Sequence, residues 1–231
     1  MFPFFFDPTY VLLIPAIILA VWAQWKVRST FAEYSQVPSR YTGAQVARTI
    51  LNQKGLTQVD VGAVPGQLTD HYDPSSNQVN LSESIYATRS VASVAVAAHE
   101  CGHALQHADG YQPMIWRAKL VPAANIGSTM AFPLFFIGLL FGRGTGILLM
   151  DLGIGLFLAA LLFHLVTLPV EFNASRRALV ILEGSGTLAA EEMVGARKVL
   201  RAAAWTYVAS ATMALMNLLR LILLRNMMDR R

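Results

Sequence analysis

The sequence predicts a mainly α-helical, polytopic membrane protein, with about four transmembrane or membrane-embedded helices and a small α+β unit. Of its 231 residues, 55% are hydrophobic and only 14% are charged, which is far more apolar than an ordinary soluble domain. Four uncharged runs each approach the roughly 20 residues that a helix needs to cross the hydrocarbon core. Nearly half of the charged residues lie in an insert of about ninety residues after the first run, long enough to fold on its own.

The first run, in residues 1–25, is expected to remain in the protein as transmembrane helix 1. A secretory signal would carry positive charge before its apolar stretch and a small-residue cleavage site after it. Here Asp7 precedes the stretch and no such site follows. Trp22 and Trp25 stand where an aromatic belt forms, and Lys26 follows at once. The run is therefore interpreted as a membrane anchor.

Residues 26–118 are expected to form the α+β unit, on the cytoplasmic side. A helix with apolar residues at helical spacing begins after Thr42, a good N-cap, and ends near Gly55. The stretch that follows alternates apolar and polar residues between turn signals, which predicts short strands, the last of them QVNL. Ser90 offers an N-cap for a further helix, which Gly110 closes.

The rest of the chain alternates between apolar and charged stretches. Residues 119–142 and 147–170 are expected to be transmembrane helices 2 and 3, and residues 202–224 a transmembrane or re-entrant helix 4. Between them, residues 171–201 are expected to be a cytoplasmic segment of two short helices, broken at EGSG. Pro169 lacks a backbone N–H, so we expect the helix to bend or restart there.

Charge bias sets the expected orientation, because cytoplasmic flanks carry an excess of Lys and Arg. Arg143 stands alone in the loop between the second and third runs. On the opposite side, basic residues flank the ends of the first, third and fourth runs, among them Lys26, Arg28, Arg176, Arg177, Arg197 and Lys198. The protein should therefore be a multi-pass protein of the cytoplasmic membrane, with its insert facing the cytoplasm. The C-terminal arginines would lie outside if the fourth run crosses, so a spanning and a re-entrant run both stay open.

Composition also excludes some classes of function. No basic run is interleaved with aromatic residues, and the excess basic residues lie beside the spans, so no nucleic acid partner is expected. The single cysteine, Cys101, excludes an internal disulfide and a zinc site built from cysteines.

The polar chemistry is concentrated in the helical stretch HECGH. Residues four apart lie on one face of a helix, so His99 and His103 project side by side and can hold one metal ion. Glu100 is turned by about 100° from His99, close enough to reach a water on that metal without binding the metal itself. The spacing matches the HExxH zinc pattern, so one Zn²⁺ ion is the predicted cofactor.

A catalytic zinc site usually has three protein ligands, so one more is needed. His107 lies about 12 Å along the helix from His99, too far to share an ion with it. The longer pattern with a third histidine fails too, because Gln106 and Asp109 occupy the positions of its glycine and last histidine. Among distant carboxylates Glu171 stands out, because it follows a span that can return the chain to the HExxH helix.

Several stretches make the sequence resemble a known family. They are HECGHALQH, LTDHYDP, NLSES, LVTLPVEFNASRRAL and GARKVLRAAAWTYVA. Over residues 41–224 the chain resembles the bacterial membrane zinc metallopeptidases called the YugP family, and its layout is similar to that of the HtpX and Ste24 membrane peptidases. The resemblance implies a gluzincin site, with His99, His103 and Glu171 as zinc ligands and Glu100 as the catalytic base.

The sequence differs at one position from the wider group of HtpX and Ste24 peptidases. That group usually has an aspartate four residues after the glutamate, where it orients a zinc histidine, and this chain has Ser175. A serine hydroxyl can accept the same hydrogen bond without charge, and Asn173 and His107 are further candidates for this outer layer. Candidate donors to the oxyanion or the substrate are His71, Tyr72 and Arg176. The strand QVNL, just before the HExxH helix, is a candidate to pair with an extended peptide.

The function expected from these features is that of a membrane-embedded zinc-dependent endopeptidase, which cleaves peptide bonds with a zinc-bound water activated by Glu100. Resemblance to membrane quality-control peptidases implies membrane-associated protein substrates in processing or quality control. The lipid bilayer is the second expected partner, and a regulatory membrane partner is not identified by the sequence. Two alternatives stay open, a zinc hydrolase acting on a non-protein amide or lipid, and a non-enzymatic membrane scaffold with a structural metal.

Overall fold

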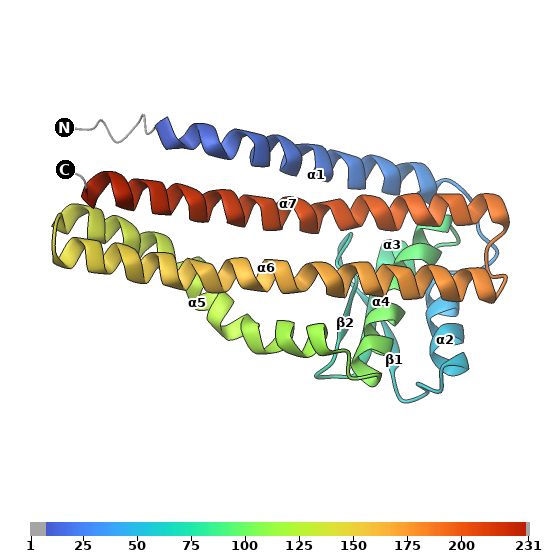
Figure 1. Cartoon of the computed structure of the whole chain (residues 1–231). Coiled ribbons are helices and arrows are strands. Elements are labelled where there is room, and N and C mark those ends of the chain that lie inside the picture. Colours follow the sequence, from blue (N-terminus) through green and yellow to red (C-terminus); the bar gives the residue numbers. More distant parts are fainter. Residues whose placement is uncertain (1–7, 230–231) are drawn as a thin grey trace. The chain divides into compact units, whose positions relative to one another are not determined.

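The computed structural model describes residues 8–229, which fold mainly into helices (Figure 1). The helical elements are η1 (Pro8–Leu13), α1 (Ile14–Ser35), α2 (Gly43–Gln53), α3 (Glu83–Tyr86), α4 (Val91–Ala108), α5 (Gln112–Phe141), α6 (Thr145–Gly184) and α7 (Ala190–Asp229). The strands β1 (Asp60–Val64), β2 (His71–Asp73) and β3 (Gln78–Ser82) form one small sheet. The predicted mainly helical chain with a small strand element is confirmed. Residues 1–7 of the expected first span lie outside the described residues.

Four stretches are long and apolar enough to cross a membrane. They are Pro8–Ser35, Gln112–Phe141, Thr145–Gly184 and Ala190–Asp229. The last two are 40 residues long, about 60 Å at a rise of about 1.5 Å per residue. Because the hydrocarbon core is only about 30 Å thick, a bilayer would hold only part of each.

The expected restart of the helix at Pro169 is wrong, because α6 continues through it. A proline removes one backbone hydrogen bond, and a long helix packed against neighbours tolerates that loss. The two short helices expected in residues 171–201 are instead the end of α6 and the beginning of α7. They are separated by a turn in which Gly186 has a φ of 62°.

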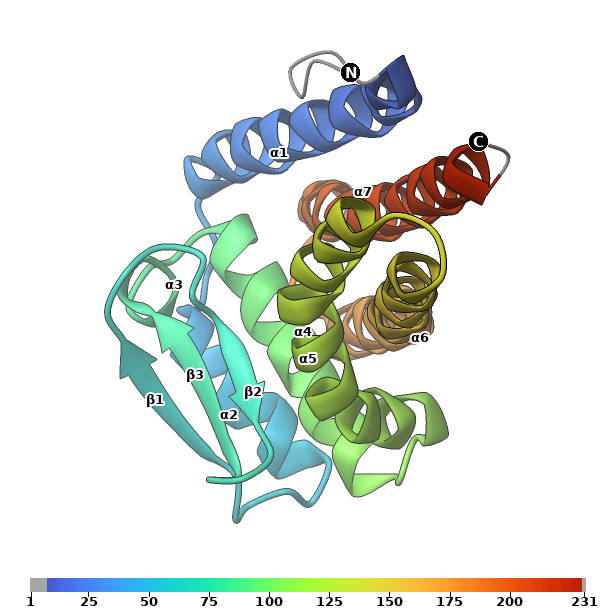
Figure 2. The same cartoon turned by 90° about the vertical axis from the view of Figure 1, so that its left-hand side faces the viewer.

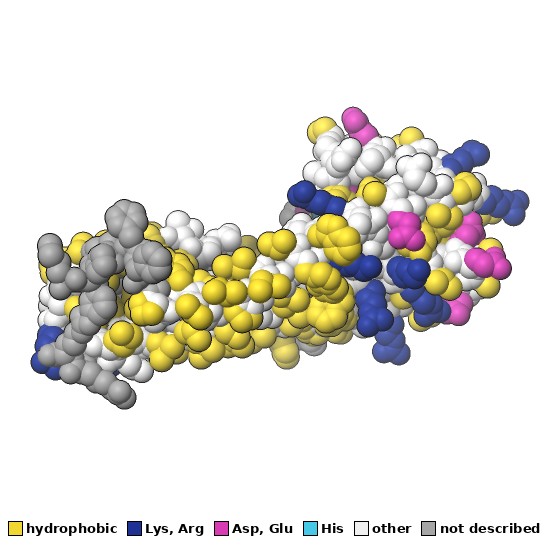
Figure 3. Space-filling view, turned by 90° about the horizontal axis from the view of Figure 1, so that it is seen from above, with side chains coloured by type: hydrophobic (Ala, Val, Ile, Leu, Met, Phe, Trp, Pro, Cys, Tyr) yellow, Lys and Arg dark blue, Asp and Glu magenta, His cyan; other side chains and the backbone are white. Residues whose placement is uncertain are grey.

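One compact unit comprises residues 8–22, 115–168 and 207–229. Its α5 and α6 pack with their backbones in close approach, because a Cβ on Gly153 would lie 2.8 Å from the carbonyl oxygen of Ala131. Small residues allow such contacts between membrane helices. The exposed side chains along these long helices are largely hydrophobic (Figure 3).

Polar contacts in the same unit join α7 to the beginning of α6 and to the turn between α5 and α6. The Arg225 guanidinium donates two hydrogen bonds to the Asp151 carboxylate, of 2.8 and 3.0 Å. Arg143, in the turn, donates from Nη2 to the carbonyl oxygen of Asp229 over 2.8 Å. The C-terminal end of α7 therefore lies beside this turn.

The second unit comprises residues 23–114 and 169–206 and is built around α4. The predicted caps are confirmed, since the Thr42 hydroxyl accepts from the Gln45 N–H and Ser90 accepts from the N–H of Ser93. The apolar face of α2 packs on α4, so α4 is buried along most of its length.

The sheet of this unit has β3 in its centre, parallel to β1 and antiparallel to β2 (Figure 2). QVNL lies in β3, and from Gln78 to Asn80 it has a strand on both sides. The expectation that QVNL pairs with a peptide is therefore wrong for Gln78 to Asn80, whose backbone groups already pair on both sides, while Leu81 pairs with β1 alone. β2 forms an edge of the sheet and packs against α4.

Candidate metal centre

Two histidines project side by side from α4, one helical turn apart. The ring centroids of His99 and His103 lie 4.7 Å apart, with the ring planes nearly perpendicular at 84°. His103 is buried and His99 is half-buried. The two imidazoles therefore converge on one point, as their spacing in the sequence predicts.

Glu171 reaches the same point from α6. Its Oε2 atom lies 3.2 Å from Nε2 of His99 and 3.5 Å from Nε2 of His103. The three donor atoms all lie within 4.8 Å of one another, and Glu171 is 2% exposed. The structure thus brings together the three residues that the sequence analysis proposed as ligands.

Gly102 explains how the two helices come so close. A Cβ at this position would lie 2.6 Å from the carbonyl oxygen of Ala174, on α6. A glycine is therefore required there for α4 and α6 to pack backbone against backbone. This close approach places Glu171 within reach of both histidines.

The donor set fits a zinc ion. Zinc bonds of about 2.0–2.1 Å in a tetrahedron place neighbouring ligand atoms about 3.3 Å apart, and both measured separations from Glu171 agree. The other ring nitrogens are already engaged, since Nδ1 of His99 lies 3.1 Å from Ser175 Oγ and Nδ1 of His103 lies 3.0 Å from Gln106 Oε1. When each Nδ1–H donates to these oxygens, each Nε2 lone pair points to the centre.

The electrostatics of the centre also favour a cation. Burial lowers the pKa of His103, but its hydrogen bond with Glu171 and the negative charges of Glu100 and Glu171 raise it more, so the pKa lies above its ordinary value. The same carboxylates that stabilise a proton on His103 stabilise a dication in its place.

Glu100 is a buried carboxylate of a different kind. It is only 7% exposed and forms no hydrogen bond to any residue in the described part of the chain. Burying a carboxylate without a hydrogen-bond partner costs folding free energy, and such groups concentrate at functional sites. Its position next to His99 on α4 suits a group that acts on a water at the metal.

Gln106 is a residue of this centre that the zinc motif does not predict, since in the sequence it only occupies the glycine position of a longer zinc pattern. It is fully buried, and its Nε2 donates to the carbonyl oxygen of Val170 over 2.8 Å and to Asn173 Oδ1 over 3.0 Å. The available signal was a polar residue three positions after His103, on the same face of an otherwise apolar helix.

Two of the three candidates for the outer layer contact this arrangement. Ser175 lies against His99, and Asn173 touches neither histidine but supports Gln106 and accepts from Nε of Arg177 over 2.8 Å. His107 is not in the cluster, because its Nδ1 lies 2.7 Å from the hydroxyl of Tyr72.

The three candidate donors to an oxyanion or a substrate lie in other surroundings. Tyr72 is buried and also donates to Asn77 Oδ1 over 2.9 Å. His71 has Nδ1 2.8 Å from the carbonyl oxygen of Thr69 and Nε2 3.3 Å from Asn80 Nδ2. Arg176 is exposed on α6. Their roles stay predictions.

Comparison with known proteins identifies the family of the chain. A family model described as "Putative neutral zinc metallopeptidase" matches residues 9–226. The chain belongs to this family. Within the family it is similar to a protein of Bacillus subtilis (strain 168) named "Putative membrane protease YugP", with 48% identity over 215 residues, which are 92% of this chain and 94% of that protein. No solved structure matches the chain. The family resemblance seen in the sequence is confirmed.

Proposed function

We propose that this protein is a membrane-embedded zinc endopeptidase of the gluzincin type, which cleaves membrane-associated proteins in processing or quality control. The observation that carries the proposal is the convergence of His99, His103 and Glu171, with the two distances from Glu171 Oε2 to the histidine Nε2 atoms close to those of a tetrahedral zinc site. Glu100, which directly follows His99 in the sequence, adds a carboxylate without a hydrogen bond among the described residues. A structural zinc site would have four protein ligands. Three donors leave one position open for chemistry.

In this proposal each residue has one task. His99, His103 and Glu171 hold a single Zn²⁺, and Ser175 and Gln106 fix the orientation of the two imidazoles. When bound, the metal lowers the pKa of a water and polarises the scissile carbonyl. Glu100 takes the proton from that water and delivers it to the leaving amine.

The edge strand β2 replaces QVNL as the element that aligns the substrate. It lies at the edge of the sheet and packs against α4, which carries the histidines. An extended peptide that adds to an exposed edge gains main-chain hydrogen bonds whatever its side chains. This suits a protease that acts on unfolded segments of many proteins.

The proposal is tested by purifying the protein in detergent, measuring bound zinc and assaying cleavage of casein. Glu100→Gln should keep its zinc and lose activity by about 10²- to 10⁴-fold, because only the proton transfer is removed. Glu83→Gln, which changes an exposed glutamate of the same unit, is the matched control and should retain both. Cleavage by Glu100→Gln at the wild-type rate, or a wild type that binds no zinc, would refute the proposed mechanism.

A further inference from the structure

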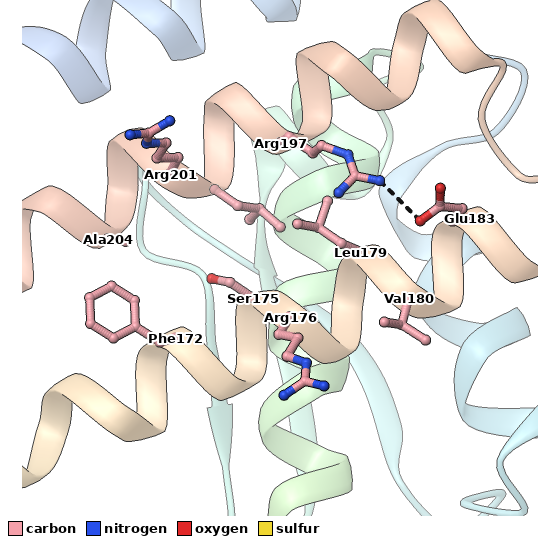
Figure 4. A pocket seen from close by; sticks show the side chains of 10 residues that line it. Phe172, Ser175, Arg176, Leu179, Val180, Glu183, Arg197, Arg201 and Ala204 are labelled. Carbon is pink, nitrogen blue, oxygen red and sulfur yellow. Dashed lines mark hydrogen bonds and ion pairs between the residues drawn. The ribbon is translucent and has the colours of Figure 1, made fainter.

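A groove lies between α6 and α7 in the second unit (Figure 4). It has a volume of about 300 Å³. Ten residues line it, which are Phe172, Ser175, Arg176, Leu179, Val180, Glu183, Arg197, Leu200, Arg201 and Ala204. Of these residues only Ser175 has a task in the proposed metal chemistry, and the proposed alignment of a peptide on β2 uses none of them.

The charge of the groove is positive. Arg197 pairs with Glu183 across it, with 3.0 Å between Nη2 and Oε2. Arg176 and Arg201 are both exposed, and neither has a carboxylate partner among the described residues. They come from α6 and α7 respectively, so one arginine stands on each of the two helices that border the groove (Figure 4). Two unpaired guanidinium groups favour an anion, phosphate above all.

Two apolar residues and the ion pair of the lining lie at opposite ends of the groove. Phe172 and Ala204 lie at one end of the groove, and the Arg197–Glu183 pair lies at the other (Figure 4). Phe172 comes two residues after the apolar run that ends at Val170, and Ala204 belongs to the run that begins at residue 202. The apolar end therefore adjoins the parts of α6 and α7 that are apolar enough to enter a membrane.

We propose that this groove binds an anionic phospholipid. Figure 4 draws the guanidinium groups of Arg176 and Arg201 apart, on opposite sides of the groove, so both exposed side chains would turn towards it to hold the phosphate. The first part of an acyl chain would lie along Phe172 and Ala204. Free phosphate would leave the apolar end of the groove empty. The acidic side chains of a peptide would gain little binding energy from that apolar end. Ser175 lines the groove and also contacts His99, so a bound lipid touches the residue that orients a proposed zinc ligand. That coupling rests on the proposed function, whereas lipid binding does not.

The test counts lipids on the intact protein by native mass spectrometry in detergent, during titration with phosphatidylglycerol or with phosphatidylcholine of the same acyl chains. Wild type should bind one phosphatidylglycerol in preference to phosphatidylcholine. The double variant Arg176→Gln/Arg201→Gln should bind it roughly 30-fold more weakly. Ala204→Phe, which fills the apolar end, should also lose it. The matched control is Lys26→Gln/Arg28→Gln, which removes two exposed charges beside the first span and should bind like wild type.

Each contrary result has its own meaning. Equal weakening by the control variant would show general attraction of anionic lipid to a basic protein and overturn the site. A different result would show a simple anion site: lipid binding is lost in the arginine variant but kept in Ala204→Phe, and inorganic phosphate displaces the lipid from wild type. Displacement of the lipid by an acidic peptide substrate would assign the groove to substrate instead. Zinc content is measured on the same samples, so a failure of the metal proposal is seen separately.

Discussion

Gln106 links the metal centre on α4 to the backbone of α6. Its carboxamide accepts from His103 and donates to the carbonyl oxygen of Val170, one residue before Glu171. A single buried side chain thus orients one proposed ligand and holds the helix that supplies another. Such outer contacts fix the tautomer and the ring angle of a ligating histidine.

We expect Gln106→Leu to weaken zinc binding by about 10- to 100-fold, because Nδ1 of His103 loses its acceptor. The affinity is measured by competition with a chromogenic chelator. Ser93→Ala is the matched control, since Ser93 is a buried polar residue of the same helix that bonds to Ser90 instead. It should lower the melting temperature but leave the zinc affinity unchanged. An unaltered affinity in Gln106→Leu would show that His103 is oriented by other contacts.

At the scale of residues, spacing along one helix was enough to predict that His99 and His103 converge, because helix geometry alone places them. The role of Glu100 stays a prediction. Glu171 required the order of apolar runs and a family resemblance. Its spacing from His103 could have pointed to Gln106, but the partners of Gln106 on α6 depend on how closely two helices pack. No spacing in the sequence encodes that distance.

At the scale of elements, the packing of α4 on α6 depends on Gly102. We expect Gly102→Ala to cost about 1–3 kcal/mol of stability, because its methyl group would meet the backbone of Ala174. It should also weaken zinc binding by moving α6, and with it Glu171, away from the histidines. Thermal unfolding and zinc affinity measure the two effects.

Gly155→Ala is the control for that substitution. Gly155 lies inside α6, and a Cβ there would meet nothing within 4 Å. Alanine should therefore raise stability by about 0.5–1 kcal/mol, since it is the better helix former. Equal behaviour of the two variants would mean that close packing at Gly102 does not position Glu171.

Periodicity and capping residues predicted most elements, because those signals are local. The caps at Thr42 and Ser90 are examples. The two errors are not local. Whether Pro169 interrupts a helix depends on the neighbours that support it, and whether QVNL is an edge strand depends on the order β1-β3-β2.

At the scale of the whole molecule, the contacts of Arg143 and Arg225 bear on the fourth apolar run, which the sequence left as spanning or re-entrant. They hold the C-terminal end of α7 beside the turn between α5 and α6. α7 is also continuous from Ala190 to Asp229. If the pair α5 and α6 crosses the membrane, α7 should cross it too, and its C-terminal end should lie on the side of that turn.

This topology is tested with reporters fused to the C-terminus. Alkaline phosphatase, active only outside the cytoplasm, should be active there, and green fluorescent protein should be dark. Fusions made after Gly186, in the turn between α6 and α7, should give the opposite pattern, because that turn is expected in the cytoplasm with the metal centre. The same pattern at both positions would show that α7 does not cross.

The donor set joins two parts of the chain that are made at different times. Glu171 follows His99 by 72 residues, and the two apolar runs of α5 and α6 lie between them. A chain still emerging from the ribosome therefore holds its histidines and Glu100 without the third donor. The site is complete only after both runs have been made, so under the proposed function the order of synthesis would delay proteolysis until the chain is nearly finished.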